Sequence, residues 1–278
     1  MFSSLPMAVM WMLPLGVVLL YNCSAAFRYH ARFTFFTLWL MVTSSGPIPL
    51  MLLRPRNWRN ALIPSWFARG LSWLLGISWE IRGMENVKAV EEGCVVLINH
   101  QSALDMLVFA ELWPRLGNGA VISKKEVFYL WPFGLATWLW GTIFIDRLNS
   151  EKARSTISST ANIIRQKKVK LCMFPEGTRN DGKALLPFKK GAFHVALDAQ
   201  RPLLPVAVSR YYFLDAKTKK FDGGSNIISI LPPVPTKGLG RNDLDELIEK
   251  TRAIMDAEVT RISEEAVRRA TARGVKVD

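Results

Sequence analysis

The chain has 278 residues and a formal net charge of +13, and half of its residues are apolar. This apolar content excludes intrinsic disorder, and the absence of a repeat excludes collagen-like and coiled-coil architectures. Only Arg28 and Arg32 are charged among the first 53 residues, whereas about a quarter of the remainder is charged, as in an ordinary water-facing domain. We therefore expect a hydrophobic N-terminal segment followed by one folded domain.

Residues 1–56 are interpreted as a membrane anchor of two helices. The apolar stretch from Leu5 to Tyr21 would reach about 26 Å as a helix, and the uncharged stretch 33–53 about 31 Å, against a hydrocarbon core of ~30 Å. Pro47 and Pro49 would end the second helix early. Three alternatives are open: a hairpin of two spans, two helices dipping into one leaflet, or a cleaved signal peptide ending near Ala25 and lacking a positive n-region.

Residues 57–79 contain four tryptophans among arginines, a composition typical of a membrane interface. Core packing of these tryptophans is the equally weighted alternative. The net positive charge suits an anionic membrane surface or an anionic substrate. Nucleic acid is not expected as a partner, because the basic residues are dispersed and no nucleic-acid-binding signature occurs.

The three cysteines are widely spaced and form no CxxC pair, so we expect neither a zinc site nor a disulfide framework. Cys94 and Cys172 each lie in an apolar run and are interpreted as buried thiols. No GxSxG, Walker A or GxGxxG sequence is present, and the absence of HExxH leaves a metalloprotease unsupported.

Short apolar runs alternate with helical patterns through residues 80–278, which predicts an α/β domain with a mixed, largely parallel sheet flanked by helices. Helices are predicted at 103–112, 127–139, 151–167, 190–199 and 243–271. The predicted strands are Ile77–Ile81, Cys94–Ile98, Ala120–Ser123, Thr142–Ile145, Val169–Phe174, Leu203–Val208 and Ile227–Leu231.

His100 directly follows a predicted strand, where α/β folds place reactive groups. Asp105, five residues later, would point back at the imidazole if His100 lies in the turn and Asp105 in the first helical turn. The sequence Ser102 to Asp105 also fits a capping box, so the carboxylate could instead bond a backbone N–H. The two roles are compatible, because a carboxylate can serve several donors.

A second group of candidate residues follows another strand, in FPEGTR (174–179). Pro175 and Gly177 break that strand, and Thr178, backbone N–H groups and the Arg179 fork suit a phosphate or an oxyanion. Lys124 and Arg147 also stand at strand ends. A parallel sheet gathers its carboxyl ends on one edge, so an imidazole would meet several cations there, as a site that deprotonates an anionic substrate requires.

The blocks NHQSALD (99–105), IFIDR (143–147), FPEGTR (174–179) and LLPVAV (203–208) resemble the four ordered motifs of the glycerolipid acyltransferase family. Within it, the chain is most similar to the lysophosphatidate acyltransferases of the animal endoplasmic reticulum. The resemblance covers roughly residues 75–240. A lone HxxxxD would be a weak signal, but HxxxxD and EGTR at this separation, each after a strand, are specific.

The resemblance implies that His100 is the general base toward the sn-2 hydroxyl of lysophosphatidate and that Asp105 orients it. It also implies that acyl-CoA is the co-substrate and that no metal and no bound cofactor is required. The implied phosphate-binding residues are Lys124, Arg147, Glu176, Gly177, Thr178 and Arg179. It also implies residence in the endoplasmic reticulum membrane with a cytosolic active site. Membrane lipids are the implied partners, and the oligomeric state is left open.

Three alternatives to this function are kept. A related acyltransferase would use glycerol 3-phosphate or another lysophospholipid as acceptor, a hydrolase would use His100 to activate water, and a lipid-binding protein would need no base. Residues 127–145 are uncharged and long enough to suggest a third span. A span there would separate Arg147 from His100 by a membrane thickness, so we predict that this stretch does not cross.

Overall fold

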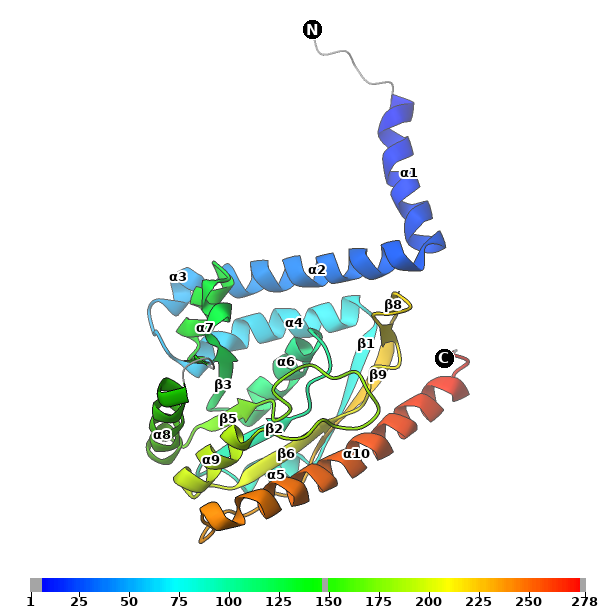
Figure 1. The fold of residues 1–278 in the computed structure, drawn as a ribbon. Coiled ribbons are helices and arrows are strands. Elements are labelled where there is room, and N and C mark those ends of the chain that lie inside the picture. Colours follow the sequence, from blue (N-terminus) through cyan, green and yellow to red (C-terminus); the bar gives the residue numbers. More distant parts are fainter. Residues whose placement is uncertain (1–6, 147–149, 276–278) are drawn as a thin grey trace.

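The computed structural model describes residues 7–146 and 150–275 and contains a seven-stranded sheet with helices on both faces (Figure 1). A separate hairpin pairs β7 (Leu214–Asp215) with β8 (Lys220–Phe221). The strands of the main sheet are β1 (Ile77–Arg82), β2 (Cys94–Ile98), β3 (Gly119–Lys124), β4 (Ile143–Ile145), β5 (Lys170–Met173), β6 (Leu203–Val208) and β9 (Gly224–Ile230).

The strand order is β1-β9-β6-β2-β5-β3-β4. Strands β6, β2, β5, β3 and β4 are mutually parallel, whereas β9 pairs antiparallel with β6 and carries β1 parallel to itself. The seven predicted strands and the mixed, largely parallel sheet are therefore confirmed. Every residue of β2 is buried, which explains why a strand covered on both faces reads as the unbroken apolar run CVVLI.

The helices lie in two layers. One core joins the sheet to α8, α9 and α10, and another joins the opposite face to α2, α4, α5 and α6. The α-helices are α1 (Met7–Cys23), α2 (Ala25–Ser45), α3 (Ile48–Met51), α4 (Leu62–Leu74), α5 (Met84–Lys88), α6 (Asp105–Leu116), α7 (Phe133–Leu139), α8 (Ser150–Lys167), α9 (Lys190–Ala199) and α10 (Leu244–Ala272). Three 3-10 helices are η1 (Trp58–Ala61), η2 (Lys125–Tyr129) and η3 (Arg241–Asp243).

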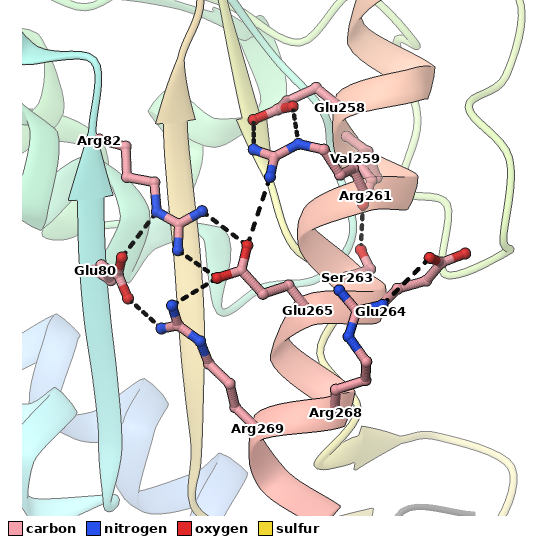
Figure 2. A network of polar contacts seen from close by, with 10 residues as sticks. All are labelled: Glu80, Arg82, Glu258, Val259, Arg261, Ser263, Glu264, Glu265, Arg268 and Arg269. Atoms are coloured by element: carbon pink, nitrogen blue, oxygen red, sulfur yellow. Dashed lines mark hydrogen bonds and ion pairs between the residues drawn. The ribbon is translucent and has the colours of Figure 1, made fainter.

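An ion-pair network fastens α10 to the edge strand β1 (Figure 2). Glu265 accepts two hydrogen bonds from Arg82, at 2.9 and 2.7 Å, and pairs with Arg269 at 2.6 Å. Arg269 in turn reaches Glu80 on β1. The side chain of Arg82 is about a quarter exposed and that of Glu265 about a fifth, so this bidentate, shared network is better placed to stabilise the fold than isolated surface pairs.

The expectation of membrane-spanning helices in residues 1–56 is not met. Within the described ranges, no helix is both long and apolar enough to cross a bilayer. α1 has 17 residues, and α2 includes Arg28 and Arg32. The apolar stretch 33–53 is also divided, because α2 ends at Ser45 and α3 is a separate short helix.

α2 packs on the domain, whereas α1 points away from it (Figure 1). Phe36 of α2 is only 3% exposed, and the Trp39 indole donates to the carbonyl oxygen of Phe67 in α4 at 3.0 Å. Arg32 donates to the carbonyl oxygen of Leu75, where α4 ends. α2 is therefore an integral layer of the fold that begins within the predicted anchor.

Residues 57–79 form η1, α4 and the start of β1. The helix α4 was not predicted from the sequence. α4 buries Ala68 and Leu71 against the sheet, while Trp66 and Trp73 are 67% and 78% exposed. The inner face of α4 therefore packs in the core, whereas Trp66 and Trp73 are exposed, and the membrane-interface role of this segment stays a prediction.

Residues 127–145 form no long helix. Only 133–139 of the predicted helix 127–139 is α-helical, preceded by η2 and followed by β4, which pairs with β3. Ala136 and Leu139 are buried in a small core with Met51 of α3. The stretch therefore forms no single helix of spanning length, and its position relative to a membrane stays a prediction.

Candidate active site

His100 and Asp105 meet at the carboxyl end of β2. The Nδ1 atom of His100 lies 2.6 Å from Oδ2 of Asp105, whose side chain is only 4% exposed. His100 stands in the turn after the strand, and Asp105 is the first residue of α6, so the carboxylate points back at the ring as expected. Because Nδ1 contacts Asp105, Nε2 is the ring nitrogen on the side away from this carboxylate.

The Asp105 carboxylate performs both roles that the sequence left open. Besides His100, its Oδ2 atom accepts the backbone N–H groups of Gln101 at 2.7 Å and Ser102 at 3.2 Å. Its Oδ1 atom accepts the hydroxyl of Tyr211 at 2.7 Å. The carboxylate therefore closes the turn at the start of α6 and orients the imidazole at the same time.

The Glu176 carboxylate joins the His100 turn to the loop after β5. Its Oε1 atom accepts the backbone N–H of His100 at 2.9 Å, and Oε2 accepts the Asn180 side-chain amide at 2.9 Å and the Leu186 N–H at 3.0 Å. A second link runs from the N–H of Asn180 to the carbonyl oxygen of His100 at 2.8 Å. Glu176 is 1% exposed, so its charge is directed to the protein's own backbone.

The face of the His100 ring is covered by Phe174, the first residue after β5. The two rings are stacked at 3.8 Å with an interplanar angle of 13°. Phe109 of α6 contacts Phe174 edge-on at 5.4 Å between centroids. The aromatic residue of FPEGTR thus fixes the plane of the imidazole, a role that the sequence pattern did not suggest.

Gly177, Thr178 and Arg179 continue from Glu176 toward the surface. Gly177 adopts a φ of 71°, which favours glycine, and a Cβ there would lie 3.2 Å from Cγ of Lys189. Thr178 and Arg179 are exposed and so available to a ligand. In the loop after β5, Glu176 is therefore buried, whereas Thr178 and Arg179 are exposed.

Lys124 ends β3 and is exposed at the same sheet edge as His100, two strands away along the order β2-β5-β3. The histidine, the EGTR loop and this lysine therefore follow the carboxyl ends of parallel strands at one edge of the sheet, and their joint role in one site stays a prediction. Arg147 lies outside the described residues. Its neighbour Asp146, which follows β4, pairs with Lys125 at 3.8 Å.

Tyr211 and Arg210, which follow β6, were not predicted. Burial, together with the nearby charge of Asp105, raises the pKa of Tyr211 well above its usual value, so the phenol stays protonated and donates. Arg210 donates to the carbonyl oxygens of Asn180 and Ala184 at 2.7 and 3.3 Å, and burial lowers its pKa. The only available signal was their position directly after the strand LLPVAV, because their partners are distant in sequence.

The two buried cysteines behave as the sequence suggested. Cys94 and Cys172 are fully buried in β2 and β5, and burial raises the pKa of Cys94 to about 12 and that of Cys172 further. Their thiols are therefore core groups and not nucleophiles.

Comparison with known proteins agrees with this geometry. Residues 78–209 match the protein-family model described as Acyltransferase. This range includes the turn that holds His100 and Asp105, Lys124, and the loop that holds Glu176. The fold and the site thus define an acyltransferase domain.

Full-length relatives identify the family more closely. The chain is 37% identical over 237 residues to the 1-acyl-sn-glycerol-3-phosphate acyltransferase alpha of Homo sapiens, covering 85% of this chain and 83% of that protein. It is 34% identical over 219 residues to the 1-acyl-sn-glycerol-3-phosphate acyltransferase of Salmonella typhimurium, covering 78% and 87%. The chain belongs to the 1-acyl-sn-glycerol-3-phosphate acyltransferase family.

A solved structure shares the fold. The crystal structure of the 1-acyl-sn-glycerophosphate (LPA) acyltransferase PlsC from Thermotoga maritima superposes with a TM-score of 0.66 at 22% identity, covering 84% of this chain and 96% of that chain. The layered α/β architecture is therefore that of an enzyme of known structure.

Proposed function

We propose that the protein transfers an acyl chain from acyl-CoA to the sn-2 hydroxyl of 1-acylglycerol 3-phosphate, giving phosphatidate for phospholipid and triacylglycerol synthesis. The observation that carries this proposal is the 2.6 Å contact between His100 Nδ1 and Asp105 Oδ2 at a strand end, within a family whose printed names specify this acceptor. The names support the acceptor, and the acyl-CoA donor follows from the resemblance.

In the proposed reaction, Nε2 of His100 takes the proton from the sn-2 hydroxyl as its oxygen attacks the thioester carbonyl carbon. Asp105 stabilises the imidazolium that forms. The C–S bond then breaks, and the departing thiolate of coenzyme A recovers the proton from the imidazolium. No covalent acyl-enzyme and no metal or cofactor is needed, which agrees with Ser102 serving as a turn residue and not as a nucleophile.

We assign the acceptor phosphate to the exposed cations at this edge. Arg179 offers a planar fork and Lys124 a point charge, with Arg147 as the third predicted cation. Gly177 and Thr178 shape the loop that presents Arg179. Glu176 is best described as the residue that builds this loop, since its oxygens are engaged by His100, Asn180 and Leu186.

We propose that an apolar face over α2, α4 and the segment 128–131 contacts lipid. Its exposed side chains include Val42 at 69%, Trp66 at 67%, Trp73 at 78% and Trp131 at 69%. An apolar area of this kind, next to basic residues such as Arg69, suits a monotopic attachment to an anionic bilayer surface. The endoplasmic reticulum membrane, with the active site on the cytosolic side, is the proposed location.

An acyl-transfer assay on the detergent-purified protein tests the function. With oleoyl-CoA and lysophosphatidate, the wild type should release thiol and form phosphatidate, and His100→Ala should reduce turnover roughly 10²–10⁴-fold. Thiol release without phosphatidate, unaffected by glycerol 3-phosphate or other lysophospholipids, would instead identify a thioester hydrolase.

A further inference from the structure

Two buried carboxylates adjoin His100. The Asp105 side chain is 4% exposed and contacts the imidazole, and Glu176 is 1% exposed and accepts the backbone N–H of His100. Within residues 7–146 and 150–275, neither carboxylate forms an ion pair with a lysine or an arginine. Hydrogen bonds satisfy their oxygens, but buried charges also need an opposite charge nearby. A cation close to both acids is therefore expected behind the histidine.

Arg210, which follows β6, is placed to supply this charge. Its guanidinium donates to the carbonyl oxygens of Asn180 at 2.7 Å and Ala184 at 3.3 Å. The backbone N–H of Asn180 donates to the carbonyl oxygen of His100 at 2.8 Å, and the side-chain amide of Asn180 donates to Glu176 at 2.9 Å. The guanidinium is thus joined to both the histidine and the glutamate through one residue, Asn180.

The charges that face Arg210 are negative and come from three elements. Burial lowers the pKa of the guanidinium, and four nearby carboxylates act in the opposite direction: Glu176 and Asp181 in the loop after β5, Asp256 on α10, and Asp105 on α6. Asp181 is exposed, so solvent screens it more than it screens Asp105 and Glu176. One arginine shared by several acids compensates their charge and leaves no surplus for an anionic ligand.

The acids near His100 bear directly on its protonation. Asp105 of α6 lies at Nδ1, Glu176 lies at the backbone N–H, and Tyr211 after β6 acts through Asp105. The cations assigned to the acceptor phosphate stand exposed at the same sheet edge (Lys124 and Arg179). Nearby acids favour the protonated imidazole, whereas a general base must be free of that proton at the working pH. Two acids without a counter-charge would therefore keep His100 protonated over a wider pH range.

We propose that Arg210 offsets the charges of Asp105 and Glu176 and so keeps His100 free to accept a proton at neutral pH. Arg210 is a positioning residue in this role, because it acts on the histidine through the two carboxylates and Asn180. The inference rests on the proposed function, which makes His100 the general base.

The first test follows the ring of His100 by NMR in the full-length, detergent-purified protein. The chain has only three histidines, so His100→Ala identifies the signal of this ring. The pH midpoint of the signal should rise by roughly 0.5–1 pH unit in Arg210→Gln, because loss of a nearby cation favours the protonated ring. Arg210→Lys keeps the charge and should retain the wild-type midpoint.

The matched control is Arg201→Gln. Arg201 precedes the other end of β6 and, like Arg210, has a buried Nε atom with no hydrogen-bond partner among the described residues. It pairs only loosely with Glu92, at 4.0 Å. Because Arg201 lies at the opposite edge of the sheet from His100, its loss should leave the midpoint unchanged.

The second test measures kcat/KM against pH with oleoyl-CoA and lysophosphatidate. The acid limb of the profile should move to higher pH in Arg210→Gln by the same amount as the ring midpoint, and Arg210→Lys should restore it. A raised midpoint in a protein that forms no phosphatidate would support the role of Arg210 and refute only the proposed function. An unchanged midpoint in a folded Arg210→Gln protein would overturn the inference, even if the wild type is an active acyltransferase.

A double variant decides the matter if Arg210→Gln does not fold. Arg210→Gln combined with Asp256→Asn removes one charge of each sign, and the new amide oxygen can still accept the Leu185 N–H that Asp256 accepts at 2.7 Å. Recovery of a cooperative thermal transition in the double variant would support charge compensation. A double variant that also fails to fold would show that Arg210 acts through its contacts with Asn180 and Ala184, and would overturn the inference.

Discussion

The phenolic oxygen of Tyr211 lies 2.7 Å from Oδ1 of Asp105, the carboxylate oxygen that does not contact His100. Tyr211 is 7% exposed and packs edge-on against Trp79 at 6.2 Å between ring centroids. Tyr211 is thus fixed by packing in the core, and its hydroxyl group fixes the position of the Asp105 carboxylate through a hydrogen bond. The pair of His100 and Asp105 is thus connected through Tyr211 to Trp79 of β1.

Tyr211→Phe should lower kcat roughly tenfold with little change in either KM, because the variant loses a hydrogen bond to the charged Asp105, through which Tyr211 positions His100. Steady-state kinetics and thermal unfolding are the measurements. Thr251→Val is the matched control, since it removes a buried hydroxyl that donates to Leu247 in α10. A Tyr211→Phe enzyme with lowered stability and normal kcat would show that the contact is only structural.

Asp105→Asn should lower kcat at least roughly 10²-fold and also destabilise the fold by about 1–3 kcal/mol, because one carboxylate both orients His100 and accepts two turn N–H groups. Turnover per folded molecule and denaturant unfolding separate the two effects. Asp243→Asn changes a carboxylate that, within residues 7–146 and 150–275, accepts only the Gly240 N–H, so it should alter stability alone. Normal turnover per folded molecule in Asp105→Asn would leave only the capping role.

Glu176→Gln should act mainly on the fold. The three N–H donors around the carboxylate need two acceptor oxygens, and the amide supplies only one, so we expect a loss of about 1–3 kcal/mol of unfolding free energy. The KM for lysophosphatidate should change little compared with kcat. A large increase in this KM at native stability would contradict the assignment and would place Glu176 on the substrate.

Arg179→Gln and Lys124→Gln should each raise the KM for lysophosphatidate roughly tenfold, because each removes a charge-assisted contact to phosphate. Monoacylglycerol, which has the same hydroxyl without the phosphate, is the matched acceptor: the preference for lysophosphatidate over it should shrink by the same factor. If the preference is unaffected in both variants, other cations hold the phosphate.

Acid should weaken the link between α10 and β1. Hydrogen bonds from Arg82 lower the pKa of Glu265 to about 2, from about 4.5 for the free side chain. The contribution of the Glu265–Arg82 pair to the free energy of unfolding is therefore complete above pH 4.5, the pKa of Glu265 in the unfolded chain, and is lost as the pH falls toward 2. Since the pair is partly exposed, Glu265→Gln should cost only about 1 kcal/mol at pH 7, and the difference from wild type should diminish below pH 4.5.

Glu264→Gln serves as the control for this prediction, because Glu264 forms a looser pair with Arg268 at 3.7 Å and is 65% exposed. Denaturant unfolding at pH 7 and pH 3 measures both variants. A cost for Glu265→Gln that is equal at the two pH values would mean that the network contributes through packing and not through charge.

The sequence predicted the sheet well because its strands are local signals. The run CVVLI is buried on both faces, and a strand of this kind needs no distant information to be recognised. His100 and Asp105 are close in sequence, so their contact was also predictable. The contacts of Tyr211 with Asp105 and of Glu176 with the His100 N–H join residues 106 and 76 positions apart, and no local pattern indicates them.

The N-terminal region shows the opposite limit. Uncharged residues in 33–53 satisfy a hydropathy criterion, and Pro47 and Pro49 indicated the break after Ser45, but the packing of Phe36 depends on tertiary structure. α4 was missed because its tryptophans were interpreted only by composition, although Ala68 and Leu71 form its inner face. Hydropathy reports that a residue avoids water, and it does not report whether protein or lipid replaces the water.

The burial of Phe36 between α2 and the rest of the domain has a consequence for truncation of the chain. A protease cut or a gene truncation after residue 56 would remove α2 and α3, taking away Phe36 and Met51 and uncovering Leu71 and Leu139, which are fully buried in the intact chain. The part proposed to touch lipid and the part proposed to perform chemistry would not come apart as two stable pieces. We therefore expect the proposed attachment to a bilayer and the proposed catalytic activity to be lost together on such a truncation.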